Sequence, residues 1–246
     1  MKVLLLSFCL FLPACAGTLP VQETSQVRTR LDLAEQQMMM GNPRQALNEL
    51  LAIESVAKRF PRYHYDMGMA WLALNDVEKA RLHLARAVKF KPDYGRAWNN
   101  LGLVCQLCGQ PESAEQAFHQ ALALPNYATP ELAACNLARL YEGQGRYQQA
   151  LTFALKAIHF NRSSVPALLL AGNLYTKTDQ PQKALACLQQ AIRHQPDNTA
   201  ASLLLGQNLF RLGRQKEART WLNIVLQNGT TEEIEQARQL QTLTRE

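Results

Sequence analysis

The sequence lacks the features that usually mark catalysis or nucleic-acid binding. Aromatic residues make up only 7% of the chain, and the net charge of +6 is modest for 246 residues. No run of five basic residues occurs, and basic and aromatic residues do not alternate along one segment, so a nucleic-acid interface is not expected. No glycine-rich phosphate-binding loop is present. The histidines are scattered, without metal-ligand spacing, and are expected on solvated surfaces: His64, His83, His119, His159 and His194. The sequence therefore predicts a protein without cofactor, metal or catalytic site.

Cysteines are few, and their spacing does not suggest a metal site. Cys105 and Cys108 form the only CxxC pair, whereas a structural zinc site needs a second pair. Cys105 falls where a small core residue is expected. Two alternatives stay open for the thiols: a disulfide from Cys105 or Cys108 to Cys135, or buried free thiols.

Only one long apolar run occurs, at the N-terminus. Lys2 precedes a mainly apolar stretch of ten residues, Val3 to Leu12, which is too short to span a bilayer and is typical of a secretory signal. The following Leu12-Pro13-Ala14-Cys15 resembles a bacterial lipobox. That resemblance implies a lipid on Cys15, and Ala16 in place of Asp implies the periplasmic face of the outer membrane. An ordinary signal peptide that happens to contain Cys15 is the alternative.

The most regular feature of the chain is a ladder of six alanines. Their successive intervals are 34, 34, 36, 34 and 34 residues. This period resembles the tetratricopeptide repeat, a pair of antiparallel helices that stacks into a solenoid and holds other proteins. The ladder consists of Ala46, Ala80, Ala114, Ala150, Ala184 and Ala218.

Each repeat is taken to begin nineteen residues before its alanine, with helix A in the first fourteen residues and helix B in the second half. The repeats then begin at Val27, Pro61, Gly95, Glu131, Val165 and Thr199. Position 8 is small in every repeat, as a close helix crossing requires, and position 24 is mostly bulky. Position 15 carries Gly, Asn or Asp, which tolerate the left-handed turn that ends helix A. Prolines suited to the first turn of helix B follow at Pro43, Pro111 and Pro181.

The C-terminal segment differs from the repeats. Thr230 and Glu233 fit a capping box, and an apolar stripe of Ile234, Ala237, Leu240 and Leu243 follows. The predicted fold is an all-α, right-handed superhelical solenoid of six tetratricopeptide repeats with a C-terminal capping helix. The predicted divisions are a signal peptide at 1–14, a lipidated tether at 15–26, the repeats at 27–230 and the capping helix at 231–246.

The stacked A helices are expected to line a concave groove for a protein ligand. Its candidate residues lie mainly at positions 2, 5, 9 and 12 of the repeats. They are Arg62, Tyr65, Met69, Arg96, Asn99, Leu103, Gln106, Arg139, Leu169, Asn173, Leu203, Gln207 and Phe210. Arg96, Asn100 and Asn136 also fit the start of a carboxylate clamp. The next repeat offers Pro166 and Leu170, so the clamp is incomplete.

The insertion of two residues in the third interval falls in a distinctive link. Trp98-Asn99-Asn100-Leu101-Gly102 precedes it, the link contains Pro125, Tyr127 and Pro130, and Asn136 follows. Together with the lipobox, this pattern resembles the type IV pilus pilotins, which are lipid-anchored solenoids of six repeats and include pilotins of social gliding motility. A purely structural role, with Pro125 and Pro130 stiffening a junction between helices A and B over Tyr127, is the alternative.

The resemblance implies a function without catalysis. Pilotins bind secretin subunits and promote their localisation in the outer membrane and their multimerisation for pilus assembly. The expected partners are therefore secretin subunits and a membrane reached through the lipid, with no nucleic acid and no small-molecule substrate. A scaffold lipoprotein of another envelope assembly machine is the alternative function.

Overall fold

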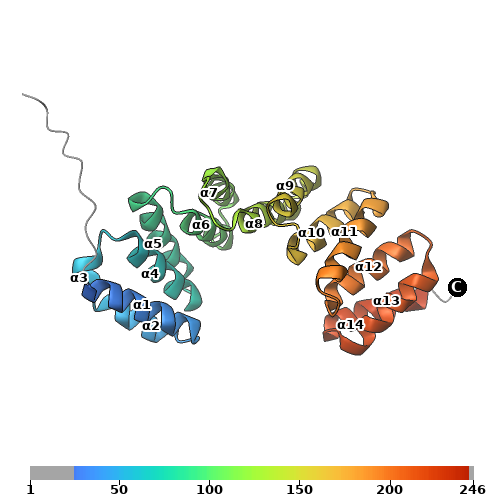
Figure 1. Cartoon of the computed structure of the whole chain (residues 1–246), viewed down its shortest axis with the longest axis horizontal. Coiled ribbons are helices and arrows are strands. Elements are labelled where there is room, and N and C mark those ends of the chain that lie inside the picture. Colours follow the sequence, from blue (N-terminus) through green and yellow to red (C-terminus); the bar gives the residue numbers. More distant parts are fainter. Residues whose placement is uncertain (1–24, 244–246) are drawn as a thin grey trace, which may run out of the picture.

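The computed structural model describes residues 25–243, and this part of the chain contains fourteen helices and no strand (Figure 1). The predicted signal peptide, most of the predicted tether and the last three residues lie outside the described residues. The A helices are α1 (Ser25–Met39), α4 (Pro61–Ala73), α6 (Gly95–Leu107), α8 (Pro130–Gly143), α10 (Val165–Lys177) and α12 (Thr199–Arg211). The B helices are α2 (Pro43–Leu51), α5 (Val77–Phe90), α7 (Pro111–Ala123), α9 (Tyr147–Phe160), α11 (Pro181–His194) and α13 (Gln215–Asn228). A short α3 (Glu54–Ala57) and a final α14 (Thr231–Leu243) complete the set.

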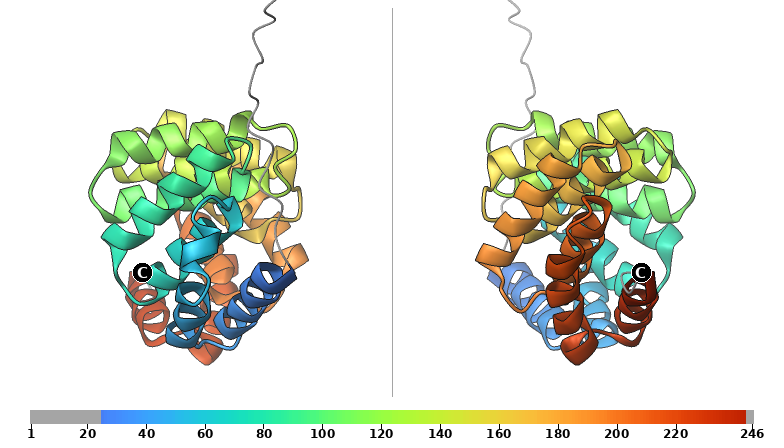
Figure 2. Two further views of the ribbon diagram at one scale, coloured as in Figure 1. Left: turned by 90° about the vertical axis from the view of Figure 1, so that its left-hand side faces the viewer. Right: turned by 90° about the vertical axis from the view of Figure 1, so that its right-hand side faces the viewer.

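The helix pairs stack in chain order into an arch, with α1 and α2 at one end and α13 and α14 at the other (Figures 1 and 2). Successive A helices pack against one another, which places them on the inner side of the curve. The B helices lie toward the outer rim (Figure 1). The predicted all-α solenoid of six repeats with a capping helix is confirmed. None of the helices described is long and apolar enough to cross a membrane.

The alanine ladder sits where helices A and B of each repeat cross. All six alanines are fully buried. The residue at position 8 lies against the residue at position 24 across this crossing, and the size of one limits the size of the other. A Cβ added to Gly102 would lie 2.5 Å from Phe118 Cε1, so a large ring opposite requires glycine. In the fourth repeat the corresponding residues are Ala138 and Ala154, both fully buried. A bulky residue at position 24 therefore requires a small residue at position 8.

The predicted turns are present in every repeat. Position 15 has a positive φ in all six, with φ of 63° at Asn75 and 56° at Asp179. This left-handed conformation reverses the chain after helix A, and Gly, Asn and Asp are the residues that adopt it most readily. Pro43, Pro111 and Pro181 occupy the first turn of their B helices, as predicted.

The link with its two-residue insertion joins α7 to α8, which is a B-to-A junction between repeats. The prediction of a junction between helices A and B was therefore wrong. Tyr127 packs beneath the link, as expected, and is only 8% exposed. Its ring lies against the first residue of α6, because a Cβ on Gly95 would come within 2.6 Å of Tyr127 Cδ2. The link thus folds back onto the start of its own repeat.

The first repeat departs from the predicted pattern. Its helix B was expected to be continuous, but α2 has nine residues, whereas the other B helices have thirteen or fourteen. A turn at Ala52 and Ile53 separates it from α3. Ile53 is buried at this break and joins Ala57 and Phe60 in the core of the first repeat.

The capping box at the start of α14 forms as predicted. Thr230 N donates to Glu233 Oε2 at 2.8 Å, and Glu233 N donates to Thr230 Oγ1 at 3.3 Å. The same carboxylate accepts from Thr199 Oγ1 at 2.9 Å, which ties α14 to α12. Ala237 is fully buried against the sixth repeat, so α14 closes the end of the core. At the other end, α1 begins at Ser25, two residues before the predicted start of the repeats.

Candidate functional site

The A helices bring the predicted groove residues to the inner side of the arch, but not all of them reach solvent. Three are exposed, namely Arg96, Gln106 and Arg139. Seven are partly exposed, namely Arg62, Met69, Leu103, Leu169, Asn173, Gln207 and Phe210. Three are buried, which corrects the prediction that they line the groove as exposed groups: Tyr65, Asn99 and Leu203. The groove therefore offers fewer contact groups than its periodic positions indicated.

Arg62 is not a free groove cation, because it joins the first repeat to the second. Its Nη2 lies 2.6 Å from Asp32 Oδ1 and 2.9 Å from Glu35 Oε2. Its Nε lies 3.7 Å from Asp66 Oδ2. Burial raises the pKa of Asp66 to about 7, although the guanidinium of Arg62 opposes that shift. The carboxylates hold Arg62 in place, so its first role is structural.

The amides proposed for a carboxylate clamp are already used inside the protein. Asn100 Nδ2 donates to Tyr65 Oη at 2.9 Å, and Asn136 Nδ2 donates to Asn99 Oδ1 at 3.0 Å. Both bonds cross between neighbouring repeats, which explains why Tyr65 and Asn99 are buried. Arg96 remains exposed, with its guanidinium 5.3 Å from the centre of the Tyr65 ring. This arrangement supports Arg96 as a contact residue but not the clamp.

The middle of the groove is a hollow of about 380 Å³. Arg139 from α8 and Leu169 from α10 line it. Asn173 also lines it, but its Nδ2 donates to Glu142 Oε1 at 2.8 Å, as does Lys177 Nζ at 2.8 Å. An exposed guanidinium beside apolar side chains suits a ligand with both acidic and apolar groups.

The capping helix narrows the C-terminal end of the groove. Gln207 and Phe210 line a hollow of about 540 Å³ together with Leu240 of α14. Leu203 lies beneath α14 and packs against Ala237, so it does not face a ligand. The sequence predicted the capping helix but not that it would cover a groove position.

The cysteines within residues 25–243 show no sign of a reactive or metal-binding role. The four that the structure describes are free thiols, so the alternative disulfide to Cys135 is not formed. Cys105 is buried in the core slot predicted for it. Burial raises the pKa of Cys135 to about 11, which disfavours the nucleophilic thiolate. Among the described residues, no group of three or more His, Cys, Asp or Glu side chains is placed to hold a metal ion.

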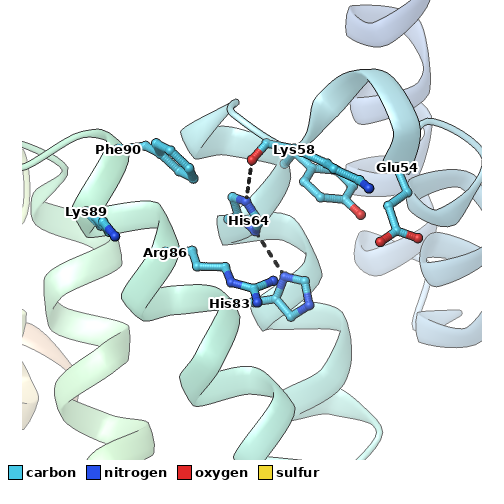
Figure 3. Close-up of a pocket in the computed structure, with 8 residues that line it drawn as sticks. Glu54, Lys58, His64, His83, Arg86, Lys89 and Phe90 are labelled. Carbon is cyan, nitrogen blue, oxygen red and sulfur yellow. Dashed lines mark hydrogen bonds between the residues drawn. The ribbon is translucent and has the colours of Figure 1, made fainter.

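A further hollow, missed from the sequence, lies between α3, α4 and α5. The prediction that all histidines are surface groups was wrong for His64, which is 3% exposed. Figure 3 shows His64 between the Lys58 carbonyl and His83. Its Nε2 donates to Lys58 O at 3.0 Å, so its Nδ1 accepts from His83 Nδ1 at 3.1 Å. A carbonyl only accepts hydrogen bonds, and this fixes both tautomers.

The environment keeps both imidazoles neutral. Burial lowers the pKa of His64, and burial together with His64 and Arg86 lowers the pKa of His83 to about 4. Phe90 stacks on the His64 ring, with 5.5 Å between the centroids. The hollow measures about 460 Å³. Its lining consists of Glu54, Lys58, Tyr63, His64, His83, Arg86, Lys89 and Phe90.

A signal for this histidine pair was present in the aligned repeats. His64 occupies position 4, where later repeats carry Trp98, Ala134, Leu168 and Ser202. His83 occupies position 23, where the later repeats carry Ala117, Phe153, Cys187 and Trp221. Two imidazoles therefore stand in mostly apolar slots of one repeat. Comparison of residue types at each position would have marked them.

Comparison with known proteins agrees with the repeat pattern. One family profile described as tetratricopeptide repeat matches residues 31–95 and 169–233, and a second with the same description matches residues 93–163. An uncharacterised protein of Methanocaldococcus jannaschii is 33% identical over 67 residues, which cover 27% of this chain and 78% of that protein. These matches identify the repeats and assign no activity.

Two solved structures share the architecture over nearly their whole length. PilW, described as a widely conserved type IV pilus biogenesis factor, has a TM-score of 0.76 and 21% identity, covering 89% of this chain and 99% of its own. PilF of Pseudomonas aeruginosa has a TM-score of 0.76 and 17% identity, covering 86% of this chain and 96% of its own. At these identities the likeness is one of fold. With repeat profiles that match more than half of its length and six helix pairs built on one buried alanine ladder, the chain belongs to the tetratricopeptide repeat family.

Proposed function

We propose that this protein is a pilotin, an outer-membrane lipoprotein that binds secretin subunits and promotes their localisation and multimerisation for type IV pilus assembly. Tetratricopeptide solenoids present extended concave surfaces to protein partners. The protein acts as a binding and assembly factor without catalysis. Cys15 carries the lipid, and the solenoid faces the periplasm.

The observation that carries the proposal is the near full-length likeness to two pilus proteins. The match covers 99% of PilW and 96% of PilF, so it includes the number of repeats and not only one unit of a common fold. The lipobox-like sequence before Cys15 and the link around Tyr127 support the same family independently of the fold.

The partner binds along the inner side of the arch, across the second to fifth repeats. The accessible groups there are Arg96, Gln106, Arg139 and Leu169. Two exposed guanidinium groups with apolar and amide neighbours favour a peptide segment of mixed acidic and apolar character. Such a surface gives moderate affinity over a long contact.

The direct test is capture of the partner from envelope extract with the full-length protein, followed by mass spectrometry. We expect a secretin among the bound proteins, and loss of secretin multimers in a deletion strain. Recovery of another envelope complex with no secretin, together with normal multimers in the deletion strain, would reject the pilotin function in favour of a scaffold for a different machine.

A charge reversal locates the binding surface. Arg96→Glu should weaken secretin binding about tenfold, because a charge-assisted hydrogen bond becomes a repulsion. Arg193→Glu on the exposed side of α11 is the matched control and should bind normally. Arg62→Glu is unsuitable here, since it would set four carboxylates against one another. Equal affinity for the Arg96 and Arg193 variants would move the binding surface elsewhere.

The membrane anchor has its own test. Cys15→Ser should release the protein into the soluble periplasmic fraction, because no acyl chain can be attached. Continued fractionation with the outer membrane would contradict the lipid anchor while leaving secretin binding to be judged separately.

A further inference from the structure

The hollow beside the His64–His83 pair has an unusual charge environment for this protein. Lys58, Arg86 and Lys89 line it, and Glu54 is its only acid, so the lining carries a net charge of +2 with both histidines neutral. Among the described residues, no ion pair is formed by these three; the paired cations are Arg30, Arg62, Lys79, Arg81, Arg146, Lys177 and Arg214.

The floor of the hollow is rigid and built from polar groups at normally apolar positions. The bond from His64 to the Lys58 carbonyl and the bond between the imidazoles fix both rings. His83 Nδ1 donates within the pair, so its Nε2 carries the free lone pair. Phe90 forms an apolar wall against His64 (Figure 3). Placing two imidazoles in core slots costs burial free energy, which a purely structural core would avoid.

We propose that this hollow binds a phosphate-type anion, held by Arg86, Lys58 and Lys89 over the imidazole floor. A guanidinium provides the paired donors that match phosphate oxygens, and the lysines add charge. A hollow of about 460 Å³ accommodates a phosphate ester with part of its substituent. The site lies between α3, α4 and α5 and shares no residue with the predicted groove, so an anion and a protein partner bind at the same time.

Two sources supply such a phosphate, a soluble ester or a phospholipid headgroup. The headgroup lies within reach if Cys15 is anchored. Ten residues separate Cys15 from Ser25, a span of at most about 35 Å at full extension. Ser25 lines a hollow with Ala52 and Ile53, directly before the α3 wall of the anion site. The binding chemistry is the same for both sources.

The test follows the histidine ring signals of the full-length protein by NMR during titration with sodium phosphate at constant ionic strength. We expect saturable shifts at His64 and His83. Arg86→Gln should weaken binding about tenfold, by loss of a charge-assisted contact. Gln120 and Gln190 stand at the same position of other repeats, so this substitution is compatible with the fold.

Lys156→Gln is the matched control, because Lys156 occupies the same position in the fourth repeat and loses the same charge. It should bind phosphate like the wild type. A second arm measures binding to vesicles containing phosphatidylglycerol. Vesicle binding that depends on Arg86, without a response to free phosphate, supports the headgroup as the ligand. The proposal is overturned if neither probe shifts the histidine signals, or if both variants weaken binding equally.

Discussion

The two ends of the solenoid are joined in different ways. Between the first and second repeats, the apolar core is supplemented by Arg62 with its carboxylates and by the bond from His64 to the Lys58 carbonyl. Between the fifth and sixth repeats, leucines such as Leu188 and Leu205 dominate. The difference shows that the repeat pattern governs packing within a unit, whereas the properties specific to this protein reside in residues between units.

The largest effect is expected from a cavity in the apolar seam, which is the junction between the fifth and sixth repeats. Leu205→Ala should lower the free energy of unfolding by about 2–5 kcal/mol, because Leu205 is almost fully buried and its neighbours cannot close the space. Urea unfolding followed by circular dichroism measures the loss. Leu107→Ala is the control, since Leu107 is 65% exposed and should change stability little. Equal losses in both variants would contradict the assignment of the seam.

The stability of the polar seam, which is the junction between the first and second repeats, should instead depend on pH through Asp66. Its folded pKa of about 7 exceeds the ordinary value of 3.8, so the folded state holds the proton more tightly and stability falls as pH rises from about 4 to 7. Asp66→Asn should remove this fall and stabilise the protein at pH 8 by about 1–3 kcal/mol.

The histidine pair should have the opposite effect on stability as the pH rises. The pKa of His83 is lowered to about 4, so the unfolded state binds the proton more tightly and stability rises with pH between about 4 and 6.5. This rise should become visible in Asp66→Asn and be smaller in Asp66→Asn combined with His83→Phe, in which only His64 remains of the pair. Asp197→Asn, on an exposed turn, is the control for the first change. An unchanged pH profile in Asp66→Asn would show that Asp66 titrates normally.

A smaller effect is expected from Arg62 itself. Arg62→Gln should destabilise the protein at pH 8 by about 1–2 kcal/mol, between the values for exposed and buried ion pairs, because three carboxylates lose their shared cation. Arg139→Gln removes an exposed arginine and should be nearly neutral. Thermal unfolding distinguishes the two, and similar melting temperatures would argue against a structural role for Arg62.

The smallest effect tests the cap at the leucine-rich end. Thr230→Ala should cost about 1 kcal/mol, because the Glu233 amide loses its hydrogen-bond partner. Hydrogen exchange should accelerate in α14 and leave α4 and α5 unchanged. Thr152→Ala, in the interior of α9, is the comparison. Faster exchange throughout the arch would mean that the cap stabilises both seams.

The sequence predicted the features that recur in every repeat and missed the features that do not recur. The buried ladder at Ala46 and its equivalents, the positive φ at Asn75 and the capping box at Thr230 followed from spacing and backbone preference. Burial of Tyr65 and Asn99 did not follow, because it depends on partners from a neighbouring repeat. The break after α2 is equally invisible to a periodic argument, since nothing in the 34-residue spacing changes there.

The candidate site shows the same division. Periodicity placed Arg96 and Arg139 in the predicted groove, and both are exposed. It also placed Arg62 there, but the acidic residues that hold Arg62 come from the preceding repeat and from its own helix. Leu203 does not line the groove because the capping helix covers it, and the position of that helix over the groove depends on tertiary packing.

Tyr127 fastens the middle of the arch. The link packs its ring onto Gly95, at the beginning of the same repeat, and rests on Trp98 and Ala133 to either side. A force that pulls the two ends apart must displace this ring from its contacts before the third and fourth repeats separate. The junction between the first two repeats is held differently, by the contacts of Arg62 with Asp32 and Glu35. The middle of the arch is therefore fastened by an apolar ring, whereas its N-terminal end is fastened by charge.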